Sequence, residues 1–550
     1  MLSVAIICYW PSTFAVALLL LLQTFCHSET ITIDPASRRF VDNFKRERVL
    51  HGVNAVFKTA PYYPMLSGFD TNNTLSEVDA KLLAGWGFNV VRLGIIWGAV
   101  EPTTRGQYDQ TYVSKMKEIV NTLKSQGIYV LLDMHQDLWH RKFCGEGVPD
   151  WLQQECAAEF ESGKRTHAFP SPVVKTGPYP QDEEGNPELG SCLSKPFFDY
   201  YLTSEVSAAF QCLYDNQRTQ WQALGDVWRM LAAAFKDSDN VLGYEIINEP
   251  WFGDIYNHPE LLEPGRTEKT YLQPMYSLVH DAIRQVDDRK IIFFEGMTTD
   301  YFPSGFSAAP GPASYNNRQA LSYHIYCLPN PNKVEVPLCA GANAEFFDMR
   351  KKDGERLGIP TIMTEFGAVQ EELKGALLDL ESLAKQSDKH LQSFIYWQYK
   401  YYNDLTTCTP SGESLFNNDG TPSQHKLETL TRPFPEAVAG STTEYGFDLK
   451  TAKFHLSYTV RRGDASSADL EARTTVVRLN PAMHYPSGVR ISISGSAGTA
   501  VKFVCASGPA SISLIQSEGQ ESETKGGTVE LTVEPCGADT AETCSCTFKQ

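Results

Sequence analysis

The feature that most constrains this chain is a regular alternation, between about residues 49 and 432, of short apolar runs and longer amphipathic stretches. Parallel strands joined by crossover helices produce this pattern, because such strands are buried on both faces. The runs Ile128–Leu132 and Ile291–Phe294 are continuously apolar, as buried strands require. The eight candidate strands are Val49–Phe57, Phe88–Gly94, Ile128–Met134, Val241–Ile247, Lys290–Glu295, Leu321–Tyr326, Pro360–Phe366 and Ser393–Gln398.

Helical patterns separate these strands. They cover Leu75–Trp86, Tyr112–Gln126, Ala223–Phe235, Tyr271–Val286, Ala342–Leu357 and Gln370–Gln386. Strand and helix units repeated eight times predict an α/β fold, a closed (β/α)8 TIM barrel, over residues 29–435. A long segment rich in Pro, Gly, Cys and aromatic residues, at about 136–218, interrupts the alternation after the third strand. Because loops after strands shape the active face of such a barrel, we expect this insertion to wall the substrate cleft.

After Pro435 the pattern changes to short β-rich runs separated by Gly, Pro, Ser and Asp. These runs are Lys453–Val460, Thr474–Leu479, Val489–Ser494, Val501–Cys505 and Gly527–Val533. They predict a C-terminal antiparallel β-sandwich domain over residues 436–550. A length of 550 residues agrees with two domains. The sandwich is interpreted as a packing domain rather than a carbohydrate- or lipid-binding one, because no aromatic cluster stands out in it.

The N-terminus carries one apolar run, Phe14–Leu22, which predicts a signal peptide over residues 1–28. No Lys or Arg precedes the run, so a retained N-terminal anchor is the alternative. We expect a secreted, extracellular protein, with a lysosomal or digestive compartment as further options. The acceptor sequence Asn72-Asn73-Thr74 fits a secreted glycoprotein.

Eleven cysteines follow the predicted signal peptide, scattered through loop-like sequence. This scattering favours disulfides in an oxidising compartment over a metal site. The pair Cys544 and Cys546 has no second pair or nearby His at ligand spacing, so no metal is predicted. A local bond between Cys327 and Cys339 is plausible because the loop between them is short, and the odd count leaves one thiol over.

The formal net charge of -18 disfavours nucleic acid and anionic membrane surfaces as electrostatic partners. A neutral substrate is therefore expected.

Two glutamates follow apolar strands in positions where a barrel presents residues to substrate. Glu249 comes after the fourth strand in Asn248-Glu249-Pro250, and Glu365 ends the seventh in Glu365-Phe366-Gly367. A carboxylate among apolar strand residues is costly unless it is paired, which favours a functional role. Cleavage of a glycosidic bond needs one carboxylic acid and one carboxylate on rigid elements. The two glutamates therefore predict a glycosidase.

Four motifs in the expected order carry a resemblance to glycoside hydrolase family 5. They are Asn248-Glu249-Pro250, Glu365-Phe366-Gly367, His324-Ile325-Tyr326 and Trp397. Three further segments, Gly52–Lys58, Asp133–Asp137 and Arg432–Gly440, resemble endoglycoceramidases more closely. This resemblance implies cleavage between the whole oligosaccharide and the ceramide of a glycosphingolipid. It also implies no cofactor.

The resemblance implies that Glu249 is the acid/base and Glu365 the nucleophile of a two-step, retaining mechanism. Burial and a nearby carboxylate should raise the pKa of Glu249 and keep its proton in place. A retaining pair should lie about 5–5.5 Å apart. Supporting roles are expected for a larger set: Asn248 at the sugar 2-hydroxyl, Tyr326 as donor to Glu365, His324 near Glu249, Arg92 paired with Glu365, and Trp397 beneath a sugar ring.

Lys58, His135 and Asp137 are implied to contact sugar hydroxyls, although Lys58 could be a solvated loop charge and His135 a barrel histidine with internal partners. Glu245 is interpreted as a structural ion-pair partner, and Glu295 stays open between structure and substrate contact. Tyr214 or Trp151, in or beside the insertion, could stack on a sugar.

A lipid-tailed substrate needs an apolar channel leading away from the scissile bond. The candidates for its lining are Phe252, Tyr301, Phe302, Pro303 and Phe306, which could equally form loop core. We expect a monomer in transient contact with a membrane or micelle surface. Two alternatives are a glucosylceramidase or other β-glucosidase acting on a single sugar, and an inactive glycolipid-binding protein.

Overall fold

The computed structural model describes residues 30–548, except 162–176, 299–300, 327–335, 370–374, 403, 405–409, 461–468, 518–525 and 538–543. The predicted signal peptide and the predicted bond between Cys327 and Cys339 lie outside the described residues. Among these residues, no helix combines the length and apolar character needed to cross a bilayer.

The predicted barrel is confirmed. Eight parallel strands close into a barrel in the order β10-β11-β4-β5-β6-β7-β8-β9. The strands are β4 (His51–Ala55), β5 (Val90–Ile96), β6 (Tyr129–His135), β7 (Val241–Glu245), β8 (Ile291–Glu295), β9 (Gln319–Ile325), β10 (Thr361–Phe366) and β11 (Phe394–Tyr396). Each one overlaps a predicted strand, because continuous apolar runs fit a sheet that is buried on both faces.

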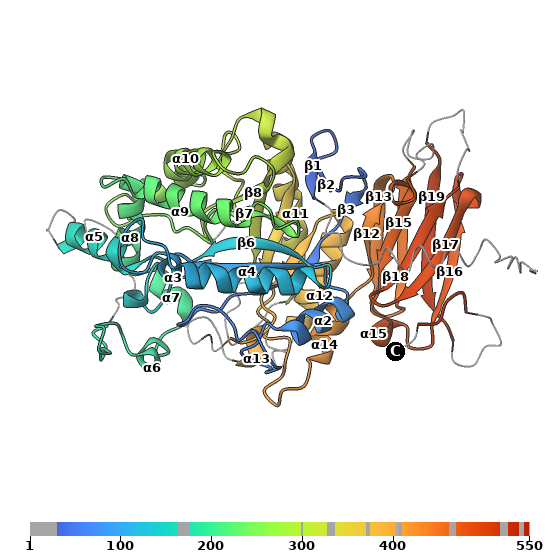
Figure 1. Ribbon diagram of the computed structural model, residues 1–550, viewed down its shortest axis with the longest axis horizontal. Coiled ribbons are helices and arrows are strands. Elements are labelled where there is room, and N and C mark those ends of the chain that lie inside the picture. Colours follow the sequence, from blue (N-terminus) through green and yellow to red (C-terminus); the bar gives the residue numbers. More distant parts are fainter. Residues whose placement is uncertain are drawn as a thin grey trace, which may run out of the picture.

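The helices of the six predicted units pack around the barrel (Figure 1). They are α2 (Glu77–Trp86), α4 (Gln110–Lys124), α9 (Gln220–Phe235), α10 (Gln273–Arg284), α11 (Val336–Leu357) and α12 (Ala376–Lys389). A capping box between Ser76 and Asp79 starts α2. Asp109 accepts from two backbone N–H groups and starts α4 two residues earlier than the apolar pattern predicts.

In the described part of the insertion after β6, four α-helices are present. They are α5 (Asp150–Glu161), α6 (Leu189–Cys192), α7 (Phe197–Tyr201) and α8 (Ser204–Asp215). Two disulfides, Cys144–Cys192 and Cys156–Cys212, tie this segment together. In Figure 1 these helices gather at the end of the barrel that faces away from the β-domain.

The predicted C-terminal antiparallel domain is also confirmed, as two sheets. One has four strands in the order β13-β14-β19-β16, and the other has seven in the order β1-β2-β3-β12-β15-β18-β17. The late strands are β12 (Phe434–Val438), β13 (Ser441–Asp448), β14 (Lys453–Thr459), β15 (Thr474–Arg478), β16 (Val489–Ser494), β17 (Val501–Ser507), β18 (Ala510–Gln516) and β19 (Thr528–Pro535). A shared apolar cluster that includes Phe454, Leu456 and Leu531 lies between the sheets. Two more disulfides, Cys505–Cys546 and Cys536–Cys544, lie in this domain.

The N-terminal residues differ from the prediction, which assigned residues 29–48 to the barrel. The strands β1 (Thr32–Asp34), β2 (Arg39–Val41) and β3 (Glu47–Arg48) join the larger sheet, where β3 pairs with β12. At the same time Ile33 and Phe40 pack against barrel residues such as Leu131 and Phe293. The physical reason is that the apolar bottom of the barrel needs a cover, which this hairpin supplies.

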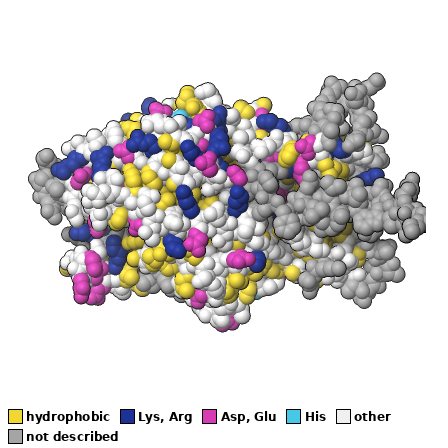
Figure 2. Space-filling view, in the orientation of Figure 1, with side chains coloured by type: hydrophobic (Ala, Val, Ile, Leu, Met, Phe, Trp, Pro, Cys, Tyr) yellow, Lys and Arg dark blue, Asp and Glu magenta, His cyan; other side chains and the backbone are white. Residues whose placement is uncertain are grey.

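Two short helices, α13 (Pro410–Glu413) and α14 (Gln424–Leu430), lead from β11 to the β-domain. On the face of the molecule shown in Figure 2, Lys and Arg side chains are interspersed with Asp and Glu over the barrel. The acidic excess of the chain is therefore not gathered into one single-sign field over the described part of that face.

A buried ion pair holds the two domains together. Arg432 lies 2.8 Å from Asp388 at the end of α12, and it donates to the carbonyl oxygen of Phe447 in β13. Burial raises the pKa of Asp388 to about 7, while Arg432 works against this shift. Asp388 therefore depends on Arg432 to stay ionised in the core.

We predict that Arg432→Met destabilises the protein by about 3–5 kcal/mol, because it leaves Asp388 buried without its cation. Thermal unfolding of the purified variants measures this change. The double variant Arg432→Met, Asp388→Leu should recover most of the loss, since two apolar groups replace the pair. The control is Lys81→Ala, which breaks an exposed pair with Glu77 and should leave the melting temperature unchanged. An Arg432→Met protein as stable as the parent contradicts the prediction.

Candidate active site

The two glutamates meet at the carboxyl ends of the barrel strands. Glu249 lies four residues beyond the end of β7, and Glu365 lies near the end of β10. One carboxylate oxygen of each, together with a ring nitrogen of His324, lie within 4.8 Å of one another. This bound applies to the nearest oxygens, and it places the two carboxylates on the same side of the cavity, close enough to act on one bond.

Arg92 on β5 is the central cation of the site and is fully buried. Its guanidinium lies 2.5 Å from Glu365, 2.5 Å from Glu245 and 3.1 Å from Asp133. Burial alone would lower the pKa of Arg92, but these carboxylates outweigh burial and raise it well above its ordinary value. The expected pairing of Arg92 with Glu365 is found in the structure, and so is the expected structural role of Glu245 as an ion-pair partner.

Glu365 is held at both carboxylate oxygens. Arg92 donates to Oε1, and the hydroxyl of Tyr326 donates to Oε2 over 2.9 Å. Burial raises the pKa of Glu365 from its ordinary value, and His324 and Arg92 limit the rise. A carboxylate with two fixed donors, one of them a guanidinium, is suited to remain ionised and to keep one orientation.

Glu249 has a different environment. Its Oε1 lies 2.6 Å from Nδ1 of His324. Burial, assisted by the charge of Asp137, raises the pKa of Glu249 to about 7. The surroundings of Glu249 therefore suit a proton donor, and those of Glu365 suit an ionised carboxylate.

His324 is a neutral imidazole at neutral pH. Burial lowers its pKa to about 4, and the nearby Glu365 opposes this shift only in part. Its Nδ1 also lies 3.2 Å from Glu295 and 3.5 Å from Glu365. One ring nitrogen thus faces three carboxylates.

Lys58, His135 and Asp137 form one connected chain of charges. Nζ of Lys58 lies 2.6 Å from Asp137 and 2.9 Å from Asp404. His135 lies between Asp133, at 2.8 Å, and Asp137, at 3.2 Å. Burial opposes protonation of His135, but the two aspartates outweigh it and raise the pKa to about 10, so the ring is a cation.

A cavity of about 230 Å³ lies over these groups. Of the residues predicted to contact substrate, His135, Asp137, Tyr326 and Trp397 line it, together with Glu249, Glu365 and His324. The remaining lining residues are Phe197, Phe198, Tyr201, Glu295, Met297, Thr298, Tyr301, Ile325, Phe346, Ala368 and Glu413.

Lys58, Asn248 and Arg92 are not among the lining residues. Lys58 is fully buried at its side chain, so the reading as a solvated loop charge is wrong. Asn248 accepts from Arg92 over 2.8 Å and donates to the carbonyl oxygen of Gln136 over 3.0 Å. These residues therefore lie behind the cavity wall, where they hold the groups that line it.

Trp397 forms one flat side of the cavity. Its ring stacks on His135 with a centroid distance of 5.2 Å, and Nζ of Lys58 lies 4.7 Å from the ring centroid. Two cations therefore contact the indole ring that lines the cavity.

The stacking candidates Tyr214 and Trp151 do not line the cavity. Tyr214 is buried on Tyr271 and donates to a backbone carbonyl, and Trp151 packs edge-on against Trp97. The aromatic side chains that do reach the cavity from the insertion are Phe197, Phe198 and Tyr201 of α7. Sequence reasoning missed them because residue type does not tell which aromatic of an insertion faces inward.

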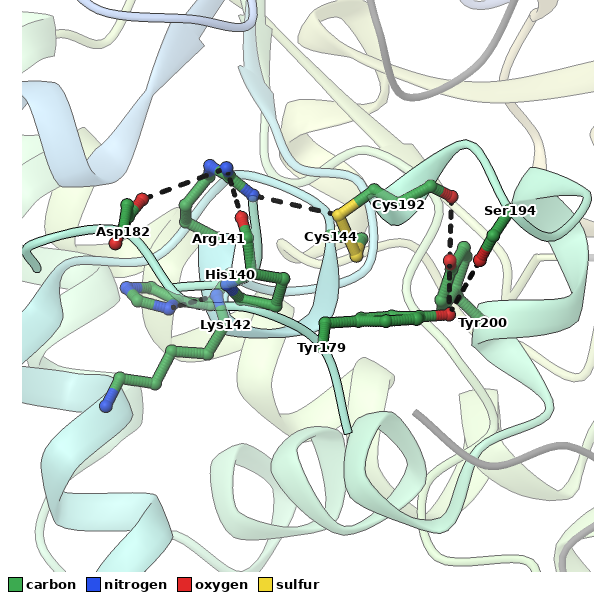
Figure 3. The surroundings of a disulfide bond; sticks show 10 residues. His140, Arg141, Lys142, Cys144, Tyr179, Asp182, Cys192, Ser194 and Tyr200 are labelled. Carbon is green, nitrogen blue, oxygen red and sulfur yellow. Dashed lines mark hydrogen bonds and ion pairs between the residues drawn. A yellow bond between two sulfur atoms is a disulfide. The ribbon is translucent and has the colours of Figure 1, made fainter. Parts of the chain in front are cut away.

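The disulfide Cys144–Cys192 anchors the segment before α7 (Figure 3). Tyr200 donates to the carbonyl oxygen of Cys192 over 2.7 Å, and its hydroxyl lies 3.0 Å from that of Tyr179. Arg141 donates to the carbonyl oxygen of Pro187 on the same segment. These contacts fix the α7 aromatics in place.

The apolar candidates after strands β7 and β8 divide in two. Phe306 is core, packed against Phe294 and Tyr276, and is therefore not part of a channel. Tyr301 lines the cavity and packs against Phe346 of α11 at 5.4 Å. Phe302, next to it, is 51% exposed. Phe252 and Pro303 do not line the cavity.

Glu413 is a cavity residue that the sequence did not reveal. It ends α13 and accepts from Gln398 over 3.2 Å. No apolar period or strand end marks this position in the sequence, so no signal pointed to it.

Three sets of His and carboxylate groups come close enough to share a cation: His135, Asp137 and Glu146; Glu245, Glu295 and His324; and Glu249, His324 and Glu365. In each set at least one carboxylate already faces a protein cation, Lys58 or Arg92. Protein cations thus provide the charge balance that a metal would otherwise supply.

Comparison with known proteins follows the same division of the chain. The profile of cellulase (glycosyl hydrolase family 5) matches residues 58–170 and 199–403, and that of the glycoside hydrolase family 5 C-terminal domain matches 432–533. An endoglycoceramidase of Cyanea nozakii is 38% identical over 84% of this chain and 87% of its own length. One of Hydra vulgaris is 36% identical over 84% of this chain and 83% of its own length. The solved structure of endo-glycoceramidase II from Rhodococcus sp. shares the fold, with a TM-score of 0.68 and 24% identity over 90% of this chain and 99% of that one.

We predict that Arg92→Lys lowers kcat/KM for an aryl β-glycoside by about 100-fold or more, because one ammonium group cannot hold Glu245 and Glu365 in the geometry of the fork. Steady-state kinetics on the purified variant measures this. Arg105→Lys, on an exposed loop, is the matched control and should retain full activity. An Arg92→Lys enzyme within about threefold of the parent, too small a change to reflect the fork geometry, would contradict the assigned role.

Proposed function

The chain belongs to glycosyl hydrolase family 5, and we propose that it is a retaining endo-glycosidase that cleaves the bond between the oligosaccharide and the ceramide of glycosphingolipids. The observation that carries this proposal is the pair Glu249 and Glu365, within 4.8 Å at their nearest oxygens, one beside His324 and the other held by Arg92 and Tyr326. The likeness to endoglycoceramidases over most of the chain supports the choice of substrate.

In the first step Glu365 attacks the anomeric carbon of the sugar attached to ceramide. Glu249 donates its proton to the glycosidic oxygen, so that ceramide leaves as a neutral alcohol. In the second step Glu249 takes a proton from water, which attacks the same carbon and releases the oligosaccharide from Glu365. Two inversions at one carbon give net retention.

The neighbouring groups assist charge changes in these steps. Arg92 and Tyr326 hold Glu365 ionised before it attacks. The hydroxyl of Tyr326 can stay hydrogen-bonded to the Glu365 carboxyl group after the ester has formed. His324 orients Glu249 through the 2.6 Å contact. Asn248, fixed by Arg92 and Gln136, lies behind the cavity wall, where it holds the guanidinium that pairs with Glu365.

The polar half of the cavity is suited to the oligosaccharide. Trp397 follows β11, His135 ends β6 and Asp137 follows β6, while Lys58, after β4, supports them from behind the cavity wall. These strands lie on one arc of the barrel. A flat indole edged by charged groups is a suitable surface for sugar rings and their hydroxyls.

The opposite arc of the cavity carries several apolar side chains beside Glu295 and His324, and these apolar groups are suited to ceramide. Met297 and Tyr301 follow β8, Ile325 ends β9, and Phe346 comes from α11. Strand β8 is the neighbour of β7, which carries Glu249, so the leaving group that Glu249 protonates enters this side. The exposed Phe302 at its edge supports transient contact with a membrane or micelle surface.

We also propose in which compartment the protein functions, from features outside the cavity. Four disulfides among the described residues support function in an oxidising compartment after secretion. The side chain of Asn72 is exposed, as a glycosylation acceptor must be. We also propose that the protein acts as a monomer.

We predict that the purified protein releases lactose and ceramide from lactosylceramide. Glu365→Gln should abolish this activity while the protein stays folded, because the nucleophile loses its charge but keeps its size. Glu355→Gln, exposed on α11, is the matched control. Product analysis by thin-layer chromatography or mass spectrometry separates the alternatives: galactose release points to an exo-acting enzyme, activity on glucosylceramide alone to a glucosylceramidase, and lactosylceramide binding without products to a glycolipid-binding protein.

The two glutamates also predict the pH profile. Glu249 must be protonated for the first step, so kcat/KM on lactosylceramide should fall as pH rises through about 7. Glu365 must be ionised, so kcat/KM should also fall as pH drops through its raised pKa. The maximum therefore lies on the mildly acidic side of neutrality. With 2,4-dinitrophenyl β-lactoside, whose leaving group needs no proton, the alkaline limb of kcat/KM should be absent from the parent and from Glu249→Gln alike. An alkaline limb that survives in Glu249→Gln contradicts the assignment.

A further inference from the structure

Glu295 is a buried carboxyl at the end of β8 that the catalytic steps do not use. It lines the cavity beside Glu249 and His324 and is 2% exposed. We infer that Glu295 is a positioning residue, which fixes the acid/base Glu249 by binding its backbone N–H and by bracketing His324. This inference rests on the proposed function, because it assigns Glu249 the proton-donating role.

The first contact, between Glu295 and the N–H of Glu249, holds Glu249 in an unusual backbone conformation. Glu249 has a φ of 37°, in the left-handed region that costs a residue with a side chain on the order of 1–3 kcal/mol. Its N–H donates to Oε2 of Glu295 over 2.9 Å. Its carbonyl oxygen accepts from Gln136 and from Thr298, each over 2.9 Å. Glu295 is the partner on the N–H side, so its loss leaves a buried donor unsatisfied on the residue whose placement matters most.

The second contact acts on the Glu249 carboxyl through His324. Nδ1 of His324 lies 2.6 Å from Oε1 of Glu249 and 3.2 Å from Oε1 of Glu295. Among the described residues, the other ring nitrogen has no hydrogen-bond partner and is buried. The orientation of the ring is therefore set at Nδ1, where Glu249 and Glu295 lie on either side of it. Glu295 thus touches Glu249 at its backbone and, through the ring, at its carboxyl.

The charges around Glu295 favour a neutral acid. Burial, together with the charges of Glu249 and Glu245, raises the pKa of Glu295 well above its ordinary value, and Arg92 only partly offsets this. The other charged or titratable groups facing this part of the cavity are His135 and Asp137 after β6, His324 on β9 and Glu365 on β10. A neutral Glu295 holds Glu249 without adding a second repelling charge. A glutamine, which has the same shape and a carbonyl acceptor, should therefore replace it.

The role predicts a selective loss of activity. Glu295→Ala should lower kcat/KM on lactosylceramide by about 100-fold, because a displaced acid protonates the alkoxide leaving group poorly. The same variant should lose less than about tenfold on 2,4-dinitrophenyl β-lactoside, whose departure needs no acid. Azide, which attacks the glycosyl-enzyme without a general base, should raise turnover of the aryl substrate and yield β-lactosyl azide. Glu295→Gln should stay within about tenfold of the parent on both substrates.

The matched control is Glu101→Ala. Glu101 is another buried carboxyl that accepts from a backbone N–H, at Gly106, and from Trp97, but it lies outside the cavity. Its loss should affect both substrates by the same factor. Equal losses on the two substrates in Glu295→Ala, or a glutamine variant as damaged as the alanine variant, would overturn the inference. A parent enzyme inactive on both substrates would instead count against the proposed function itself.

Discussion

The buried guanidinium of Arg92 is the constraint on which the rest of the site depends. Three carboxylates, Asp133, Glu245 and Glu365, approach it from three strands other than its own. Burying three carboxylates in a barrel core is costly without a cation of fixed shape, and a flexible ammonium could not hold all three at these distances. The barrel can therefore keep Glu365 charged at the floor of a closed cavity, which is the condition for its use as a nucleophile. The ion pairs of Arg92 therefore serve two purposes. They join strands β5, β6, β7 and β10, and they hold Glu365 in place for its chemistry.

A second group of charges extends this arrangement toward one side of the cavity. Lys58 balances Asp137 and Asp404, and the protonated His135 lies between Asp133 and Asp137. The two groups meet at Asp133, which contacts both Arg92 and His135. Because these ions are paired within the wall, they give the oligosaccharide side of the cavity polarity and rigidity. The facing side, from β8 and β9, contains Met297, Tyr301 and Ile325. A substrate with a sugar end and a lipid end is thereby oriented across the two glutamates.

The sequence predicted those features that local pattern determines. Eight buried apolar runs identified the barrel strands, and their ends identified Glu249 and Glu365, while the family resemblance added His135, Tyr326 and Trp397 as site residues. The sequence did not reveal features that depend on contacts between residues far apart in the chain. The strand β3 has two residues and exists because β12, almost 400 residues later, pairs with it. Lys58 was expected at a sugar hydroxyl, with a solvated loop charge as the alternative, and the sequence did not reveal that Asp404 lies 2.9 Å from its ammonium group. Tyr214 and Tyr201 are the same residue type in one insertion, and only packing buries the first on Tyr271 and turns the second toward the cavity.

Glu245 and Glu295 show how position alone leaves a role undecided. Both are the last residue of neighbouring strands, β7 and β8, and both are buried. Glu245 meets the guanidinium of Arg92 at 2.5 Å and the hydroxyl of Thr364, so it serves as a charged member of an ion pair. Glu295 meets a backbone N–H and an imidazole nitrogen, so burial dominates and the proton stays on. One partner makes the difference between the two glutamates. Glu245 contacts the guanidinium of Arg92, whereas Glu295 lies beside Glu249 and contacts its backbone N–H. One glutamate thus supports the charged nucleophile and the other, uncharged, supports the residue that must hold a proton.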